Sequence, residues 1–426
     1  MKATGRDKLS SVILWSIISA AFIGPGTVTT AASAGSQFQL QLLWAVTFAT
    51  LACIALQEVS ARITISSGLS FGEALDRKFG HQRGFWVKWL VGGSVVLGCA
   101  AYEAGNILGG TSGLVLLFGD YSKVFTIVLT FIAALILWSG RGKWISTIMT
   151  ILVAMMGFAF LALALYGNFT WGDVIRSSVV PVIPPGTELL TLGLVGTTIV
   201  PYNIFLGSGI SKGQTIPLMR VGLSISVIIG GLITAWILMA GTLASEFNSF
   251  SDLANQFQTK IGMMGVIALG VGLFAAGFSS AVTSPYAASI IATSVFNAKK
   301  KSGIVWVWAS VLAVGFLFGI TNTKPIPVIL AVQAINGLIL PLITYFLIVI
   351  VNDPSLIPSF GRHAAWYNVV LILIFGSVLV LGFNNIDKAL GTVFKLNEPH
   401  LLVVFSLSGI ISLYTAYKVM KQAASK

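Results

Sequence analysis

The chain has 426 residues, of which 56% are hydrophobic and 9% are charged. A soluble protein carries about 25% charged residues, so this composition excludes an ordinary water-soluble domain. Apolar runs of roughly 20 residues, long enough to cross about 30 Å of hydrocarbon, recur along the chain. Because each span must satisfy its own backbone hydrogen bonds, we predict an all-α membrane protein.

The boundaries of the apolar runs predict twelve transmembrane helices. We expect them near residues 9–34, 40–64, 86–117, 122–139, 144–167, 187–211, 221–242, 262–295, 303–321, 326–351, 365–385 and 400–417.

The charges predict the orientation of these spans. The net charge is +12, but the basic residues are scattered between spans, which argues against a nucleic-acid partner. Of the 25 Lys and Arg residues, 19 fall on the side of the N-terminus and 6 on the other side. Positive residues collect in cytoplasmic loops, so we predict that both termini are cytoplasmic. The compact form favours an integral protein of a plasma membrane, typical of a bacterial inner membrane.

Two of the predicted spans are interrupted in matching ways. Gly24-Pro25-Gly26 lies in the first span and Val200-Pro201-Tyr202-Asn203 in the sixth. Proline removes a backbone donor and glycine tolerates unusual dihedrals, so both stretches break a helix. Broken helices at corresponding positions of two halves point to a substrate site near the membrane midplane.

The spacing of the breaks predicts an inverted repeat. The two prolines lie 176 residues apart, one in each block of five spans. Because five is odd, the second block enters the membrane from the opposite side. We therefore expect a first repeat at residues 1–170, a second at 185–352, and two additional C-terminal spans at 365–426. This organisation is typical of a secondary transporter.

Four stretches carry a resemblance to the Nramp family of proton-coupled divalent-metal transporters. They are Gly24-Pro25-Gly26-Thr27 with Ala34-Gly35-Ser36-Gln37-Phe38, Leu56-Gln57-Glu58-Val59-Ser60-Ala61-Arg62, Pro201-Tyr202-Asn203-Ile204-Phe205-Leu206, and Ala276-Gly277-Phe278-Ser279-Ser280. The resemblance covers roughly the first ten spans. It implies transport of a divalent metal cation by alternating access, as a symporter.

The expected metal site departs from the family pattern. The family's first break reads Asp-Pro-Gly-Asn, and its two metal ligands correspond to Gly24 and Thr27. The family's selective Met corresponds to Val200, and a helping Gln of the eighth span corresponds to Phe278. The carbonyl that contributes three residues before the Met belongs here to Thr197. Thr27 and Glu103 remain as the best candidates for metal ligands.

The substrate is therefore left open between two classes. We predict substrate binding by residues around the two breaks: Gly24, Gly26, Thr27, Thr30, Thr197, Val200, Tyr202, Asn203 and Phe278. A metal cation would bind through oxygens and water. A small anion or zwitterion is the alternative, because half-helix N-termini favour negative charge and no Asp opposes them here.

Four further residues have predicted roles in coupling and gating. The resemblance places Glu103 and Asn106 at the family's proton path in the third span. A carboxylate deep in a bilayer costs roughly 2.5–3.5 kcal/mol on insertion scales, so it normally serves a function. Glu58 precedes Arg62 by one helical turn, and this pair predicts an ion pair with a possible gate role. The sixth-span histidines of the family correspond to Tyr202 and Gly207, so no imidazole is expected there.

Other function classes fit less well. The sequence shows no catalytic triad, phosphate loop or metal-ligand cluster, so we expect neither an enzyme nor a bound cofactor. A non-transporting sensor would keep the fold and lose the site, but no soluble signalling domain is recognisable. The expected partners are a small ion or solute and the lipid bilayer, and the sequence does not indicate the oligomeric state.

Overall fold

The computed structural model describes residues 5–296, 300–321, 323–394 and 400–424, and all regular elements in these ranges are helices. Eleven of the described helices are long and apolar enough to cross a membrane, or twelve when one bent pair is counted as a span. This agrees with the predicted fold class. The spanning helices are α1 (Gly5–Phe22) with α2 (Pro25–Phe38), α3 (Leu43–Ser67), α5 (Ser94–Phe118), α6 (Ser122–Ser139), α7 (Gly142–Ala164), α9 (Glu188–Thr198) with α10 (Pro201–Ile210), α11 (Ile216–Gly241), α13 (Met263–Ser294), α14 (Lys301–Ile320), α15 (Pro325–Val351), α16 (Ala365–Phe394) and α17 (Leu401–Ala424).

The two predicted breaks are both present, but they differ. Helices α1 and α2 are bent by 65° where Ile23 and Gly24 interrupt them. Helices α9 and α10 are interrupted at Ile199 and Val200, yet residues 190–210 still form one continuous span. A proline begins each second half, where its missing N–H costs nothing because the first helical N–H groups have no intrahelical acceptor.

Three shorter helices were not predicted from the sequence. They are α4 (Phe71–Lys88), α8 (Trp171–Val179) and α12 (Phe250–Ile261), and a π-helical turn (Trp89–Gly93) joins α4 to α5. Helix α12 buries Phe250, Leu253 and Phe257, which recur at helical spacing on one face. These segments lie outside the predicted spans because they are too short or too polar to span a bilayer.

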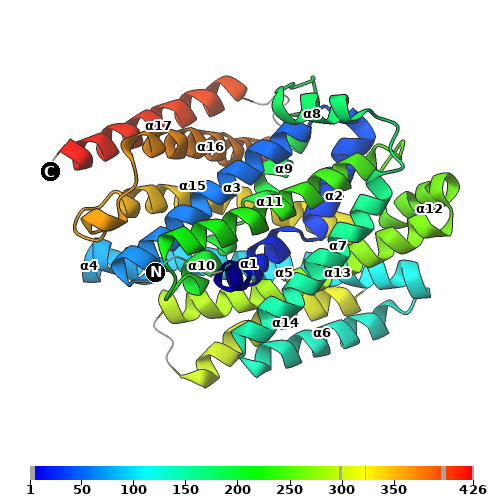
Figure 1. The fold of residues 1–426 in the computed structure, drawn as a ribbon, viewed down its shortest axis with the longest axis horizontal. Coiled ribbons are helices and arrows are strands. Elements are labelled where there is room, and N and C mark those ends of the chain that lie inside the picture. Colours follow the sequence, from blue (N-terminus) through cyan, green and yellow to red (C-terminus); the bar gives the residue numbers. More distant parts are fainter. Residues whose placement is uncertain (1–4, 297–299, 322, 395–399, 425–426) are drawn as a thin grey trace.

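The centre of the bundle is the contact between α5 and α13 (Figure 1). Helices α16 and α17 pack together at one edge of the view, and α6 and α14 pack together at the opposite edge. Helix α15 contacts both α5 and α16, so it links the core to the two last spans. The broken helices α1 and α2 both contact α13, which places the first break against the core.

Small residues let α5 and α13 approach until their backbones touch. A Cβ atom added to Gly277 would lie 2.2 Å from the backbone nitrogen of Gly110, and one added to Gly113 would lie 2.4 Å from that of Phe274. Membrane helices pack closely through such residues, since lipid provides no hydrophobic force to hold them. This contact presses the polar residues of α5 against those of α13 beside the break.

Replacing Gly277 by alanine is expected to destabilise the protein. The added methyl group meets backbone atoms that cannot rotate away, and overpacking of this kind costs about 1–3 kcal/mol. Gly303→Ala is the matched control, because nothing lies within 4 Å of a Cβ atom at that helical position. Thermal unfolding in detergent should show a lower midpoint for Gly277→Ala than for Gly303→Ala. Equal midpoints would refute the close contact.

Candidate functional site

The break between α1 and α2 frees backbone carbonyls that nearby hydroxyl groups then satisfy. In an unbroken helix the carbonyl of Ala21 would accept from the residue four positions on, but Pro25 has no N–H. The hydroxyl of Tyr202 donates to this oxygen instead, over 2.8 Å. The carbonyl of Phe22 accepts from the hydroxyl of Thr27 at 2.5 Å. Two predicted site residues therefore replace the missing backbone donors of the broken helix.

Helix α13 caps the same end of α1. The hydroxyl groups of Ser279 and Ser280 both donate to the carbonyl of Ala20, over 3.1 and 3.3 Å. Both serines are buried. The partial negative charge that a helix C-terminus carries is thus spread over hydroxyl donors from three helices. In the sequence these serines are recognised only as part of the stretch that resembles the family. Their role as hydrogen-bond donors to the end of α1 is seen only in the structure.

Gly24 brings the break into contact with α5. It precedes α2 in an extended conformation, with φ −101° and ψ −178°. A Cβ atom at this position would lie 2.9 Å from the Ser280 hydroxyl oxygen and 3.6 Å from the Asn106 amide oxygen. The Asn106 amide in turn donates to the Glu103 carboxylate over 3.3 Å. The predicted coupling pair therefore lies beside the predicted substrate site.

Glu103 is completely buried, and one of its oxygens has no hydrogen-bond partner among the described residues. Among the residues that the structure describes, the buried acidic side chains are Glu58, Glu103 and Asp353. Glu58 and Asp353 form ion pairs. Burying an unpaired charge is costly, and such groups in membranes mark ion or proton pathways. Glu103 is thus the acidic group available at the break.

Gln333 of α15 is a site residue that the sequence analysis missed. Its amide oxygen accepts a hydrogen bond of 3.0 Å from the hydroxyl of Thr30. Its amide nitrogen lies 2.7 Å from where a Cβ atom of Gly26 would be, and it has no described partner. The amide residues Gln333 and Asn336 in a largely apolar span were the signal that would have identified it.

The predicted residues of the second break differ in whether their polar groups already have partners. Thr197 turns its hydroxyl back to the carbonyl of Leu194, over 3.2 Å, and Val200 is a buried apolar residue. Asn203 is completely buried, and neither its amide nitrogen nor its amide oxygen has a described partner. The ring of Tyr202 packs edge-on against Tyr102, with 5.6 Å between centroids. Asn203 is therefore the polar group that this break offers.

Two other positions show how the departures from the family pattern are accommodated. Phe278 stacks on Phe274, one turn earlier in α13, with 5.8 Å between ring centroids. Gly207 packs against Gln57, whose amide oxygen lies 2.1 Å from where a Cβ atom would be. The Gln57 side chain thus occupies the space that a larger residue at position 207 would need.

One cavity approaches the site along α5. It has a volume of about 800 Å³ and is lined by residues of α5 from Leu108 to Leu116, by Asp120, and by parts of α12 and α15. Leu108 lies only two residues after Asn106 on the same helix. The lining includes Thr111, Ser112, Asn248 and Ser249, which are polar. The residues that line it do not include Glu103, Asn106 or a residue of either break.

Ion pairs close the opposite end of the bundle. Arg62 pairs with Glu58 within α3 and donates to the carbonyl of Gly361 over 2.9 Å, and Arg220 of α11 reaches the same carboxylate over 3.0 Å. The predicted Glu58–Arg62 pair is confirmed, and it joins three segments of the chain.

A second ion pair, between Lys78 and Asp353, ties α4 to the end of α15 at the same end of the bundle. Burial raises the pKa of Asp353, but hydrogen bonds from Lys78 and Ser355 outweigh it and hold the pKa below its ordinary value. The carboxyl group is therefore ionised at neutral pH, and the pair is charged.

Comparisons with known proteins agree with this architecture. The family model described as natural resistance-associated macrophage protein-like (Nramp) matches residues 16–386. The divalent metal cation transporter MntH of Verminephrobacter eiseniae is 27% identical over 295 residues, covering 65% of this chain and 66% of its own length. MntH of Caldanaerobacter subterraneus subsp. tengcongensis is 26% identical over 295 residues, covering 65% of this chain and 69% of its own length. The matches thus span about two thirds of these curated relatives.

The solved structures extend the likeness to nearly the whole chain. A crystal structure of the Eremococcus coleocola manganese transporter, in complex with an aromatic bis-isothiourea substituted compound, has a TM-score of 0.78 at 18% identity. It covers 97% of this chain and 93% of that one. At this identity the likeness shows the fold, and the family model shows the relationship. The chain therefore belongs to the Nramp family, whose members are membrane transporters rather than enzymes.

Proposed function

We propose that this chain is a secondary transporter of a divalent metal cation whose carboxylate ligand lies on α5 instead of at the first break. The observation that carries the proposal is the buried Glu103, which has one unpartnered oxygen and is joined to the break through Asn106. The curated relatives are described as divalent metal cation transporters, which supports the class of substrate. Alternating access and a symport mechanism follow from the family.

The donor atoms around the break favour hard cations. Glu103, Asn106 and Gln333 offer carboxylate and amide oxygens, and Thr27 and Thr30 offer hydroxyl oxygens. No cluster of three or more His, Cys, Asp and Glu side chains exists among the described residues, and Val200 provides no soft donor. Oxygen ligands suit Mg²⁺, Mn²⁺ and Ca²⁺, whereas thioether, thiolate and imidazole select softer metals. We therefore propose magnesium or manganese as the substrate, retaining part of its water shell.

The test is uptake by the purified full chain in proteoliposomes. Manganese and magnesium are each offered with and without an inward proton gradient, beside empty liposomes. Saturable uptake of either metal, stimulated by the gradient, supports the proposal. No metal uptake above the empty liposomes, from a protein that is folded and correctly inserted, would refute it.

A small anion or zwitterion is the second candidate, and one observation favours it. Helices α2 and α10 both begin at the breaks and have no acidic residue in their first turn. Their N-terminal N–H groups therefore carry partial positive charge that no side chain of that turn offsets.

Gly24→Asp distinguishes the two candidates. A new carboxylate beside Ser280 and Asn106 is expected to raise metal affinity and to abolish uptake of a small anion, because it opposes the helix N-termini. Gly24→Asn is the matched control, since it adds the same bulk against Ser280 without charge. Proteoliposome uptake measures both variants. Anion uptake that survives in Gly24→Asp would rule out the anion site at this break.

A further inference from the structure

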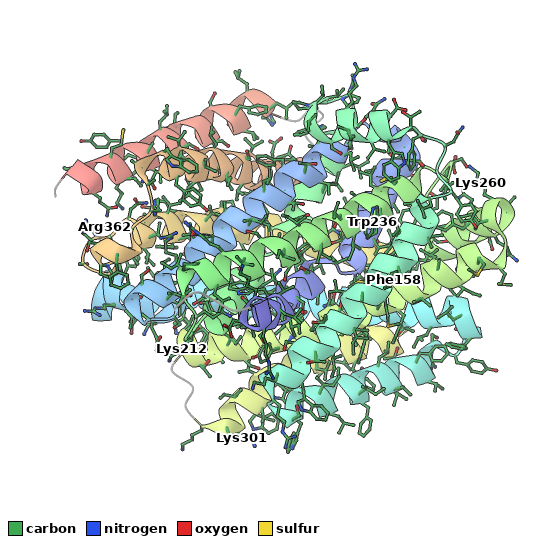
Figure 2. The ribbon with its side chains drawn as sticks, viewed as in Figure 1. Phe158, Lys212, Trp236, Lys260, Lys301 and Arg362 are labelled. Atoms are coloured by element: carbon green, nitrogen blue, oxygen red, sulfur yellow. The ribbon has the colours of Figure 1, made fainter. Side chains whose placement is uncertain are left out.

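A second polar cavity lies away from the transport site, at the end of the bundle that Glu58 and Arg62 close. We name it the basic groove. It has a volume of about 1010 Å³ and lies between α3, the start of α11 and the segment that leads into α16. Its polar lining includes Glu58, Arg62, Arg220, Arg362 and His363. In Figure 2, Arg362 lies at the same side of the view as Lys212, and Lys260 lies at the opposite side.

The charges of the basic groove do not balance. Glu58 is its acidic residue and pairs with both Arg62 and Arg220. Arg220 keeps 56% of its side chain exposed despite this pair. Arg362 is exposed, and its guanidinium makes no hydrogen bond or ion pair to the described residues. Three guanidinium groups therefore face one carboxylate, which leaves two positive charges in excess.

Two helix N-termini add to this positive field. The groove is lined by Thr215, Ile216 and Pro217 at the start of α11, and by Ala364 and Trp366 at the start of α16. Neither helix has an acidic residue in its first turn. A helix N-terminus carries unpaired N–H groups and partial positive charge, so it favours an anion. A guanidinium group can donate two parallel hydrogen bonds to the oxygens of one phosphate. The arrangement of the groove therefore fits a phosphate group.

The walls of the groove are apolar and aromatic. Ile54 and Ile65 of α3 line it, and Phe360 and Trp366 are 73% and 66% exposed. Tryptophan side chains such as Trp366 collect at the level of the lipid headgroups. A free phosphate has no apolar part that could contact such a wall, whereas a phospholipid presents its phosphate to the arginines and its acyl chains to the apolar side.

We propose that the basic groove binds the phosphate group of an anionic membrane phospholipid. Basic pockets between transmembrane helices on the cytoplasmic side are suited to such headgroups, and the distribution of Lys and Arg predicts that this side is cytoplasmic. The bound lipid would join α3, α11 and α16 beside the Glu58 ion pairs. This site shares no lining residue with the break.

The experiment measures lipid binding by the purified full chain in detergent. Phosphatidylglycerol is titrated while native mass spectrometry counts retained lipids and thermal unfolding gives the midpoint. Binding should be saturable and should weaken as salt is raised. Arg362→Gln is expected to lower the apparent affinity roughly fivefold, the effect of one basic residue at an anionic lipid surface. Because Arg362 is exposed, this variant should still fold. Lys212→Gln, at the same end but outside the groove, should bind like the wild type.

Three results would overturn the proposal. If phosphatidylcholine binds the protein and raises its thermal midpoint as much as phosphatidylglycerol does, the groove does not select for a negatively charged headgroup. Equal affinities for Arg362→Gln and Lys212→Gln would place the lipid elsewhere. Glycerol 3-phosphate that matches phosphatidylglycerol would show that the ligand is a soluble phosphate compound and not a lipid.

Discussion

Glu103→Gln is expected to abolish saturable uptake of manganese or magnesium at micromolar concentrations. The amide keeps the shape of the side chain and can still accept the hydrogen bond from Asn106, so the fold should survive. What is lost is the negative charge that offsets the dehydration of a divalent cation. Ligand charge sets the affinity of oxygen sites over orders of magnitude, so we expect roughly a hundredfold loss in metal affinity. Calorimetric titration and proteoliposome uptake measure it.

Two further variants make this test specific. Glu246→Gln, in an exposed segment, is the matched control and should transport like the wild type. Glu103→Gln combined with Asn106→Asp moves the carboxylate one turn along α5, closer to Gly24, and should restore part of the uptake. Metal binding and uptake that are unchanged in Glu103→Gln would exclude this residue as a ligand. Binding that persists while stimulation by the proton gradient disappears would assign Glu103 to proton coupling instead.

The second large effect is on stability, at the Glu58 ion pairs. Glu58→Ala leaves Arg62 without its carboxylate although only 4% of its side chain is exposed. Breaking a buried pair by removing one partner costs about 3–5 kcal/mol, since the remaining charge is uncompensated. We therefore expect a large decrease in the thermal midpoint in detergent.

The control is an ion pair that is more exposed to solvent. Asp76 and Lys88 lie 2.7 Å apart with 30% and 20% of their side chains exposed, so Asp76→Ala should cost no more than about 1 kcal/mol. A loss of stability as small as this in Glu58→Ala would contradict the proposed closing role of the buried pair. The apolar double replacement Glu58→Leu with Arg62→Met should restore stability, because well-packed apolar groups can replace a buried pair. Altered transport in that stable variant would then support a gate role.

The ion pairs and the break are connected through α3 and α10. The hydroxyl of Ser60 donates to the carbonyl of Ile204 over 2.5 Å, and the hydroxyls of Thr64 and Ser208 lie 2.8 Å apart. Helix α10 begins at the second break, so any movement of its first turn changes its contact with α3. This contact is a physical route by which closure at Glu58 and Arg62 can respond to substrate at the midplane.

The sequence by itself determined the membrane class, the number of spans, both helix breaks and the pair of Glu58 with Arg62. These follow from local causes: hydrocarbon thickness sets the span length, proline removes a backbone donor, and residues four apart share a helix face. The division into repeats at residues 1–170, 185–352 and 365–426, and the cytoplasmic location of the termini, stay predictions.

Only the tertiary structure decided which polar groups meet at the break. Tyr202 was predicted as a site residue, but its role as the donor that replaces the N–H of Pro25 depends on a contact across 181 positions of the chain. Gln333 and Thr30 meet across 303 positions, and Arg220 joins Glu58 across 162. No periodicity within one span encodes such contacts, because they depend on how separate helices cross. The backbone contact of Gly110 with Gly277 sets that crossing, and it thereby places Asn106 and Ser280 beside Gly24.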